Sequence, residues 1–406
     1  MSDSNKNTKD YLLNTIHKKT KMTIVIPCFN EPDLNTSLES IYLCDKPRCH
    51  VEVIVVINAS ENENETIIQQ NKHTYVEATK WIKKNKSDYL NFYLLNISLP
   101  KKHAGVGLAR KTGMDLAAKR LSSINQSNGI IICFDADSKC ATNYLVAIEE
   151  HFEKNPKSPA ASIYFEHPLE GDSFTNDIYE AITYYELYLR YYIEGLRYAK
   201  YPFAYHTIGS SMAVRANTYL SQGGMNKRKA GEDFYFLQKL IPLGHFTEIN
   251  TTSVYPSPRI SERVPFGTGK AIGDWLKTKN KQYPTFNPDI FRDLKLLCEN
   301  IKYIYEQSPE HFLKLMPKSV VAYLNKNDFR ENMTEIKSNV STIETFSNRF
   351  YRWFNGLKVL QFVHFCRDIY YPNITLLEAC NNIAGNIKNE MTEKKMLLYF
   401  RAIQKQ

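Results

Sequence analysis

Two aspartates directly after an apolar run are the residues of this sequence that indicate chemistry most directly. Asp135 and Asp137 flank Ala136 and follow the run Gly129–Phe134. Two carboxylates on one turn repel each other unless a cation lies between or beside them. Mg²⁺ and Mn²⁺ prefer oxygen ligands and commonly bind one or two protein carboxylates together with substrate phosphates. The pattern therefore indicates a metal site, and its alternative is a pair of solvated aspartates in a turn.

A second acidic pair, Glu232 and Asp233, follows Gly231 at the expected start of a helix. The alternative to a functional role is helix capping near the positive end of the helix dipole. Four basic side chains could accompany the carboxylates, because they lie near loops expected at the same end of the fold. They are Arg110, Lys111, Arg259 and Arg263. Their alternative is surface solvation, the commonest fate of Arg and Lys.

Buried strands must carry these residues to one place, and apolar runs predict where the strands lie. Four runs are expected as strands, namely Thr23–Pro27, Val51–Ile57, Phe92–Leu95 and Gly129–Phe134. Helices are expected between them, over Glu65–Lys84 and Gly107–Leu121 and in a segment with Leu34 and Leu38 on one face. Strands that alternate with helices predict a parallel α/β sheet of Rossmann type, whose ligands bind beyond the carboxyl ends of the strands. The polar residues named above lie at such ends.

The second half of the chain has a different pattern. Nine tyrosines, the last of them Tyr205, follow Asp177, and they predict a packed amphipathic helix. The alternative is that some of these rings line a groove that binds an acceptor substrate. In that case Tyr205–Thr207 is the segment favoured for contact with the acceptor. Thr207–Val214 is expected as a strand and Val254–Thr268 as a loop. Past Pro284 helical periodicity prevails.

Three local patterns in this last part predict how its helices begin and pack. Ser308 is expected to cap a helix with Pro309 at its first position, and Thr375–Glu378 fits a capping box. An apolar stripe at spacings of three and four runs through Ile336, Val340, Ile343, Phe346, Phe350 and Phe354. The expected organisation is a polar tail over 1–21, an α/β domain over 22–280 and a helical domain over 281–406.

Composition excludes several classes of protein. A hydrophobic content of 43% and a charged content of 23% are typical of a globular chain. No run approaches the roughly 18 apolar residues of a membrane span, and the polar N-terminus lacks a secretory signal pattern. The eight cysteines show no CxxC spacing, and Cys28, Cys133 and Cys366 lie in apolar runs. Free thiols in a reducing cytoplasm are therefore expected, without a disulfide framework or a zinc site.

The net charge of +9 is unevenly distributed, because residues up to Leu276 carry +2 and those from Lys277 onward carry +7. No basic stripe with interleaved aromatic residues indicates nucleic-acid binding. Lys388, Lys394, Lys395, Arg401 and Lys405 instead predict contact with anionic lipid or a phosphate-bearing acceptor, at the inner face of the cell membrane. A solvated helical face is the alternative.

Taken in order, four segments resemble family 2 glycosyltransferases of the GT-A fold, including those of bacterial surface-polysaccharide synthesis. The segments are Pro27–Glu31, Gly107–Gly113, Asp135–Asp137 and Gly231–Asp233. The resemblance covers Thr23–Lys270, about three-fifths of the chain. It implies a GT-A, Rossmann-like, mostly parallel sheet flanked by helices over 22–280, with an α-helical C-terminal extension.

The resemblance also implies a role for each matching residue on the donor side. The donor would be a nucleoside-diphosphate sugar, UDP- or GDP-linked, whose base and ribose contact the loop with Pro27, Phe29, Asn30 and Glu31. Asp135 and Ala136 would lie near the ribose, and Asp137 with Asp135 would hold Mn²⁺ or Mg²⁺ at the diphosphate. Arg110 and Lys111 would approach the donor, and Arg259 and Arg263 would close over its diphosphate. Asn58 stands where relatives usually carry an Asp that reads the base.

On the acceptor side, the resemblance implies that Asp233 is the general base that deprotonates a hydroxyl of a saccharide or lipid-linked acceptor. Glu232 would assist it or bind the acceptor. Direct displacement would then invert the anomeric centre. The segment Tyr255–Arg259 offers no His as a further metal ligand, so the third ligand is unassigned.

Two rival functions remain open at this stage. A nucleotidyltransferase acting on sugar phosphates would use a related sheet, but such enzymes usually begin with a glycine-rich loop, and Pro27–Glu31 contains no glycine. A non-catalytic partner subunit would keep the fold as a docking module. Such a subunit need not retain the catalytic residues, and the presence of all three of Asp135, Asp137 and Asp233 therefore argues against it.

Overall fold

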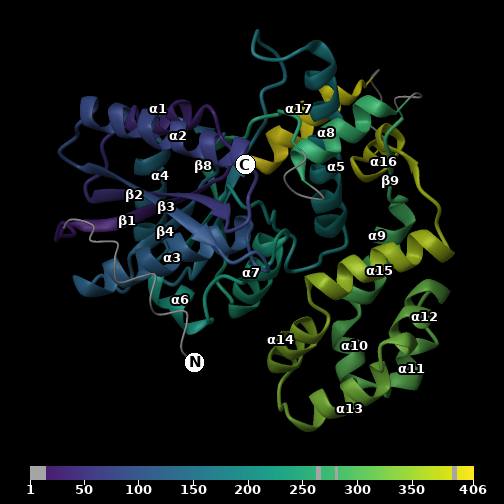
Figure 1. Ribbon diagram of the computed structural model, residues 1–406. Helices are drawn as coiled ribbons and strands as arrows, with labels where there is room; N and C mark the ends of the chain where they lie inside the picture. Colours follow the sequence, from purple (N-terminus) through teal and green to yellow (C-terminus); the bar gives the residue numbers. More distant parts are fainter. Residues whose placement is uncertain (1–14, 262–266, 279–281, 386–390) are drawn as a thin grey trace. The chain divides into compact units, whose positions relative to one another are not determined.

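The computed structural model describes residues 15–261, 267–278, 282–385 and 391–406 (Figure 1). Contacts divide them into two compact units. The sheet unit contains the described residues up to Pro168 and those between Thr207 and Gly267. The helical unit contains Leu169–His206 and the described residues from Thr268 to Gln404. This division differs from the single expected boundary near residue 280, because residues 169–206 pack with the C-terminal helices.

An eight-stranded sheet forms the centre of the sheet unit, in the order β3-β2-β1-β4-β7-β6-β8-β5. Its strands are β1 (Thr20–Cys28), β2 (His50–Ser60), β3 (Leu90–Leu99), β4 (Ile130–Cys133), β5 (Lys139–Cys140), β6 (Ala160–Phe165), β7 (Met212–Arg215) and β8 (Thr247–Tyr255). Strands β3, β2, β1 and β4 are parallel, whereas β7 runs antiparallel to β4 and β6. The mostly parallel α/β sheet is thus confirmed.

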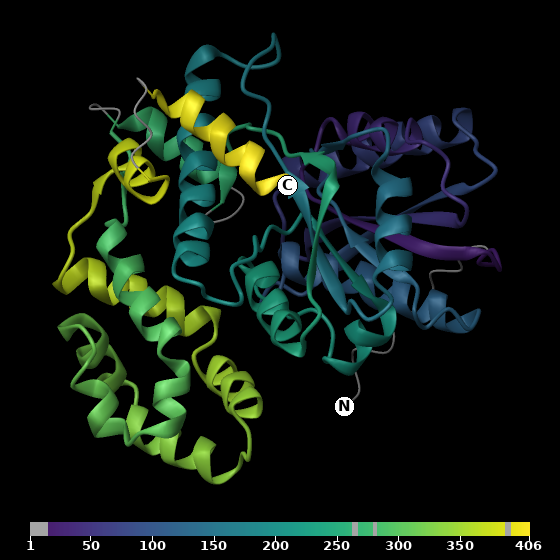
Figure 2. The ribbon, with the colours of Figure 1, turned by 180° about the vertical axis from the view of Figure 1, so that it is seen from behind.

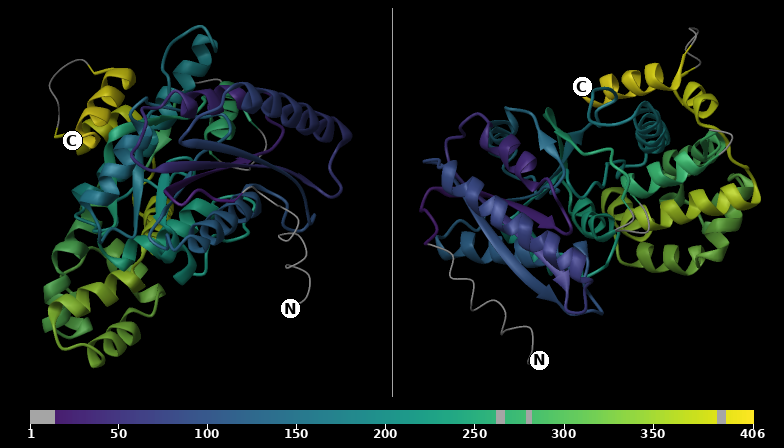
Figure 3. Two further views of the ribbon diagram at one scale, coloured as in Figure 1. Left: turned by 90° about the vertical axis from the view of Figure 1, so that its left-hand side faces the viewer. Right: turned by 45° about the horizontal axis from the view of Figure 1, so that its top comes forward.

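The first strands are buried on both faces, as their uninterrupted Val and Ile content predicts. Helices α1 (Leu34–Tyr42) and α2 (Glu65–Lys84) cover one face of β1–β3, and α3 (Val106–Ser123) covers the other (Figure 1). The sheet twists along its length, as the left view of Figure 3 shows. The remaining helices of this unit are α4 (Tyr144–Lys154), α6 (Ala216–Ser221), α7 (Glu232–Leu240) and the short η1 (Ile241–Leu243).

The helical unit is built around α5 (Asn176–Tyr198), the tyrosine-rich segment. Tyr191 packs edge to face on Phe291, and Tyr179 is also buried, so the prediction of a packed helix is confirmed. The other elements are α8 (Thr268–Lys277), β9 (Pro284–Thr285), α9 (Pro288–Glu299), α10 (Ile301–Glu306), α11 (Pro309–Leu313), α12 (Lys318–Lys326), α13 (Phe329–Ser338), α14 (Ile343–Trp353), α15 (Gly356–Ile369), β10 (Ile374–Thr375), α16 (Leu376–Ile383) and α17 (Glu393–Gln404).

Several local expectations differ from the structure. The strand expected from Thr207 begins only at Met212, and β6 and β8 were not predicted. The apolar stripe from Ile336 to Phe354 spans two helices, because α13 ends at Ser338 and α14 begins at Ile343. Ser308 caps α11 as predicted by accepting from the N–H of His311, but Thr375 forms no cap.

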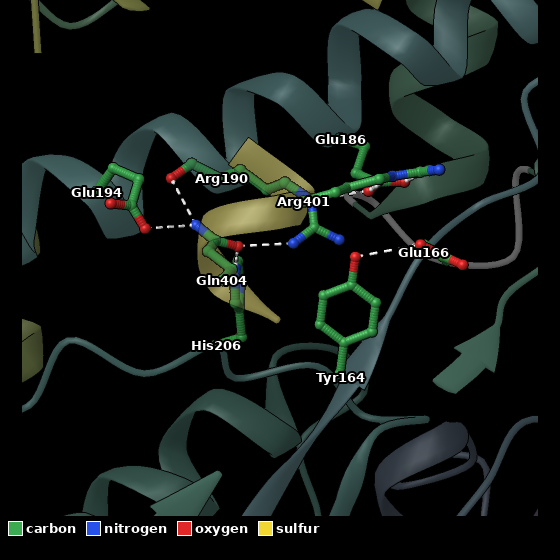
Figure 4. A network of polar contacts seen from close by, with 8 residues as sticks. All are labelled: Tyr164, Glu166, Glu186, Arg190, Glu194, His206, Arg401 and Gln404. Atoms are coloured by element: carbon green, nitrogen blue, oxygen red, sulfur yellow. Dashed lines mark hydrogen bonds and ion pairs between the residues drawn. The ribbon is translucent and has the colours of Figure 1, made fainter. Parts of the chain in front are cut away.

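Helix α17 runs beside α5 inside the helical unit (Figure 2), and a buried polar network joins the two helices (Figure 4). Glu186 accepts from Arg190 Nε at 2.8 Å and from both Nε and Nη2 of Arg401, at 2.8 and 2.7 Å. Gln404 accepts from Arg190 Nη1 at 2.6 Å and contacts His206 Nε2 at 3.0 Å. Burial lowers the pKa of His206 to about 3, so this ring is neutral and part of the packing.

Two residues of the proposed membrane-binding set take part in ion pairs. Arg401 pairs with Glu186, and Lys394 pairs with Glu170 at 3.0 Å. Lys388 lies outside the described residues. In the part of the chain that the structure covers, no helix combines the length and apolar character needed to cross a bilayer. All eight cysteines are described and carry free thiols, as predicted.

We predict that Glu186→Gln destabilises the helical unit by about 3–5 kcal/mol, because two arginines lose their buried carboxylate partner. The matched control is Glu306→Gln in the exposed Lys302–Glu306 pair, which should change stability by less than about 0.5 kcal/mol. Urea unfolding of both variants measures the difference. Equal effects would contradict the assignment of this network as a main support of α17.

Candidate active site

Polar residues from distant segments meet at the carboxyl ends of the central strands. Asp135 and Asp137 follow β4 on a tight turn, in which the N–H of Ser138 donates to the carbonyl of Asp135 at 3.1 Å. The carbonyl of Ala136 accepts from Ser37 Oγ of α1 at 2.8 Å. This bond holds the turn against the helix, and the two carboxylates remain partly exposed, at 39% and 29%.

Arg110 of α3 is buried between two acidic side chains. Its Nη2 lies 2.6 Å from Oδ1 of Asp135, and its Nη1 donates to Oε1 of Glu232. Burial acts to lower the pKa of Arg110, but Glu232 and Asp135 raise it above its ordinary value, so the guanidinium stays charged. Arg110 therefore connects the turn after β4 to the start of α7.

Asp233 lies beside this connection. Its Oδ1 accepts from the N–H of Phe234 at 2.7 Å. A Cβ added at Gly209 would come within 3.0 Å of Asp233 Oδ2 and 2.6 Å of Arg110 Nη1, so Gly209 packs against both groups. Burial raises the pKa of Asp233, and Arg110 opposes this effect. Burial also raises the pKa of Glu232, to about 7, again against the influence of Arg110.

Arg259, in the segment after β8, forms a second bridge. Its Nη1 donates to Oε1 of the buried Glu31 at 3.0 Å, and its Nη2 lies 2.7 Å from Oδ2 of Asp137. Burial acts to lower the pKa of Arg259, but Asp137 and Glu31 raise it. This bridge joins the loop after β1 to the turn after β4.

The loop after β1 is held by Asn71 of α2, which the sequence analysis did not identify. Its Oδ1 accepts from the N–H of Asn30, and its Nδ2 donates to the carbonyl of Asn58, both at 2.9 Å. Asn30 has a φ of 48°, a left-handed conformation that Asn tolerates better than most residues. The sequence does not indicate this role of Asn71, because it becomes visible only when the pairing of the two strands is known.

Asn58 itself is buried, and its Nδ2 donates to the carbonyls of Cys28 and Val56, at 2.8 and 3.3 Å. Its amide nitrogen is thus occupied by hydrogen bonds to the backbone of β1 and β2.

The structure places the other predicted site residues as follows. Pro27 is buried within β1, and Phe29 is half-buried in the loop beyond it. Lys111 pairs with Asp115 at 3.0 Å, on a different side of α3 from the Arg110 bridge. Arg263 lies outside the described residues.

Whether the residues fit a divalent cation depends on the two carboxylates after β4. Among the described residues no group of three Asp, Glu, His or Cys side chains forms a metal site. Burial raises the pKa of Asp135, with Arg110 opposing and Asp137 adding to the shift, so the two aspartates influence each other electrostatically. Two carboxylates suit Mg²⁺ or Mn²⁺ when a diphosphate supplies further oxygen ligands. The donor set fits a cation shared with a phosphate-bearing substrate.

Gly107 makes the approach of α3 to the segment before α7 possible. A Cβ at this position would lie 2.1 Å from the carbonyl oxygen of Arg228 and 3.1 Å from Cβ of Glu232. Only glycine leaves room for that backbone, so Gly107 sets the distance between Arg110 and Glu232.

Comparison with known proteins finds one family that the first half of the chain resembles. Residues 23–216 match the model of a family described as glycosyl transferase family 2. No curated protein matches the chain in sequence. Solved structures similar to the chain include residues 1–349 of S. aureus TarS in complex with UDP-GlcNAc, at 13% identity and a TM-score of 0.41, covering 82% of this chain and 90% of that one. The same TarS fragment with UDP has 12% identity and a TM-score of 0.40, covering 83% and 92%.

We predict that Gly107→Ala destabilises the sheet unit by about 1–3 kcal/mol, because backbone must move to admit the methyl group. This sign is opposite to the gain of up to about 1 kcal/mol that Gly→Ala ordinarily gives inside a helix. Lys119→Ala, at an exposed position of the same helix, is the control and should be near neutral. Urea unfolding measures the stability of both variants. A Gly107→Ala protein that is more stable than the wild type would contradict the close approach of Gly107 to the carbonyl of Arg228.

Proposed function

Because residues 23–216 match the model of glycosyl transferase family 2, we propose that the chain moves a sugar from a nucleoside-diphosphate sugar to a hydroxyl group of a saccharide or lipid-linked acceptor. The observation that carries this proposal is the pair of arginine bridges. One joins Asp135 to Glu232 beside Asp233, and the other joins Glu31 to Asp137. Together they bring groups suited to a diphosphate and to a reacting hydroxyl to one end of the sheet.

On the donor side, Arg259 is suited to stabilise the departing nucleoside diphosphate. Its guanidinium is partly exposed, and its buried Nε has no hydrogen-bond partner within the described residues. A phosphate oxygen would satisfy that N–H and pair with the positive charge where negative charge accumulates. Asp135 and Asp137 would hold a Mn²⁺ or Mg²⁺ ion, which when bound supplies further charge stabilisation to the diphosphate.

On the acceptor side, we assign Asp233 as the general base. A hydroxyl is a weak nucleophile, and a carboxylate within hydrogen-bond reach removes its proton as the bond between the sugar and the diphosphate breaks. The hydrogen bond from Phe234 fixes Oδ1 of Asp233, and Gly209, which has no Cβ, leaves room beside Oδ2. Attack from the side opposite the diphosphate inverts the anomeric centre.

Release of nucleoside diphosphate from a panel of UDP- and GDP-sugars, with Mn²⁺, with Mg²⁺ and with EDTA, tests the proposed function. We predict that Asp233→Asn lowers transfer by about 10²–10⁴-fold while donor binding stays unchanged, because only the proton acceptor is lost. Asp88→Asn, an exposed carboxylate far along the chain from the site, is the matched control. Absence of release from every donor would overturn the function, and full activity of Asp233→Asn would remove Asp233 from the role of base.

We predict that kcat/KM for transfer rises with pH through about 7 as Glu232 ionises. The groups that face Glu232 are Arg110, Asp233 and Asp135. Below this pH Glu232 is protonated and neutral. Above it, its negative charge raises the proton affinity of Asp233, which makes Asp233 a stronger base.

Glu232→Gln should remove the rise near pH 7 that the ionisation of Glu232 produces. The pH–rate profiles of the two proteins, measured with saturating metal, provide the comparison. A profile of Glu232→Gln that keeps the step near pH 7 would assign that step to another group.

A further inference from the structure

Two basic loops that the chemistry above does not use lie beside the candidate active site. The first follows β3 and contains Lys101 and Lys102. The second precedes α7 and contains Lys227, Arg228 and Lys229. All five side chains are exposed. They are called the basic loops below.

Glycine-mediated backbone packing brings the basic loops together, although more than a hundred residues separate them along the chain. A Cβ at Gly105 would lie 3.2 Å from Cα of Lys229, and one at Gly107 would meet the carbonyl oxygen of Arg228. Lys229 Nζ also donates to the carbonyl of Lys101 at 3.4 Å. The juxtaposition therefore depends on the backbone and does not require the flexible side chains.

The positive charge of the basic loops is not balanced by acidic side chains. Within the described ranges none of the five forms an ion pair, and Glu61 accepts only from the backbone N–H of Lys101, at 3.2 Å. Arg228 lies 3.7 Å above the ring of Tyr235, which orients its guanidinium without neutralising it. Like charges held close together repel, and a polyanion relieves this repulsion.

The basic loops adjoin the place where an acceptor hydroxyl must lie. The second loop leads directly into Gly231, Glu232 and Asp233, and Asn226 at its start donates to the carbonyl of Glu232 at 2.9 Å. In the proposed function the donor diphosphate meets Arg259 at the other bridge, which contains Asp137. Five further cations exceed what two donor phosphates require, so they favour a ligand on the acceptor side.

We propose that the acceptor is a polyanion, a chain that carries phosphate groups, and that the basic loops bind the stretch beside the reacting hydroxyl. This proposal rests on the proposed function, because it places Asp233 at the acceptor. A long-chain phosphate polymer would cross the loops while one hydroxyl reaches Asp233. Among the described residues, Tyr235 is the one ring in a cation–π contact with these loops, whereas nucleic-acid binding commonly uses several stacked rings.

Isothermal titration with inorganic polyphosphate, in EDTA at about 0.05 M and about 0.2 M NaCl, measures anion binding without metal. The variant Lys102→Gln/Lys227→Gln/Lys229→Gln should lose affinity by about tenfold at the lower salt and show a weaker salt dependence. The matched control Lys83→Gln/Lys84→Gln/Lys86→Gln removes three exposed charges at the far end of β3 and should retain wild-type affinity. The KM for the donor in the nucleoside diphosphate release assay should be equal in all three proteins.

Four results would overturn the proposal. An equal loss in the control would mean diffuse attraction, and a raised donor KM in the loop variant would assign the loops to the donor. Loop-dependent binding of phosphatidylglycerol vesicles without polyphosphate binding would indicate a lipid surface. Tighter binding of a single-stranded oligonucleotide than of polyphosphate of equal charge would indicate nucleic acid. If no donor releases nucleoside diphosphate, the proposed function is wrong. The measurement of polyphosphate binding would still test whether the basic loops bind a polyanion.

Discussion

A buried positive charge at Arg110 is the constraint on which the site depends. Removing a guanidinium from water is costly unless acidic partners and hydrogen bonds compensate for it. Asp135 and Glu232 provide that compensation, from the turn after β4 and from the start of α7. The same charge opposes the rise in pKa that burial imposes on Asp233, so one side chain sets both the geometry and the charge state of the acidic group. Gly107 and Gly209 are required because each admits a neighbour that a Cβ would displace.

Arg259 also bridges two carboxylates, those of Glu31 and Asp137, but it is more exposed to solvent than Arg110. It is 21% exposed, whereas Arg110 is 2% exposed. A buried bridge is suited to hold parts of the protein in place, and a partly exposed one can exchange a carboxylate for a phosphate. The difference in burial thus separates a residue that orders the site from one that can meet a ligand. Lys111, adjacent to Arg110 in sequence, pairs with Asp115 and belongs to neither bridge.

The helical unit follows a different principle. Its core is aromatic, and its buried polar network connects α17 to α5 through one carboxylate shared by two arginines. Several positive charges of the C-terminal third are therefore engaged within the unit. The charge that we propose to bind the acceptor lies in the sheet unit, on loops that the net charge of that region does not reveal.

The parallel strands, the helices between them and the acidic motifs could be predicted from the amino-acid sequence, because alternating apolar runs and local caps are encoded by neighbouring residues. The sequence did not predict β6, β8 or the break between α13 and α14, since these depend on pairing and packing across long distances. Asp135, Asp137 and Asp233 were candidates from their local acidic motifs, and the resemblance to a family implied their roles. Three features emerge only once the chain has folded: Arg110 is enclosed between Asp135 and Glu232, Asn71 holds the loop after β1, and Lys101 lies beside Lys229. Burial and contact between distant segments set the charge and the partners of each side chain, and neither quantity exists before the chain folds.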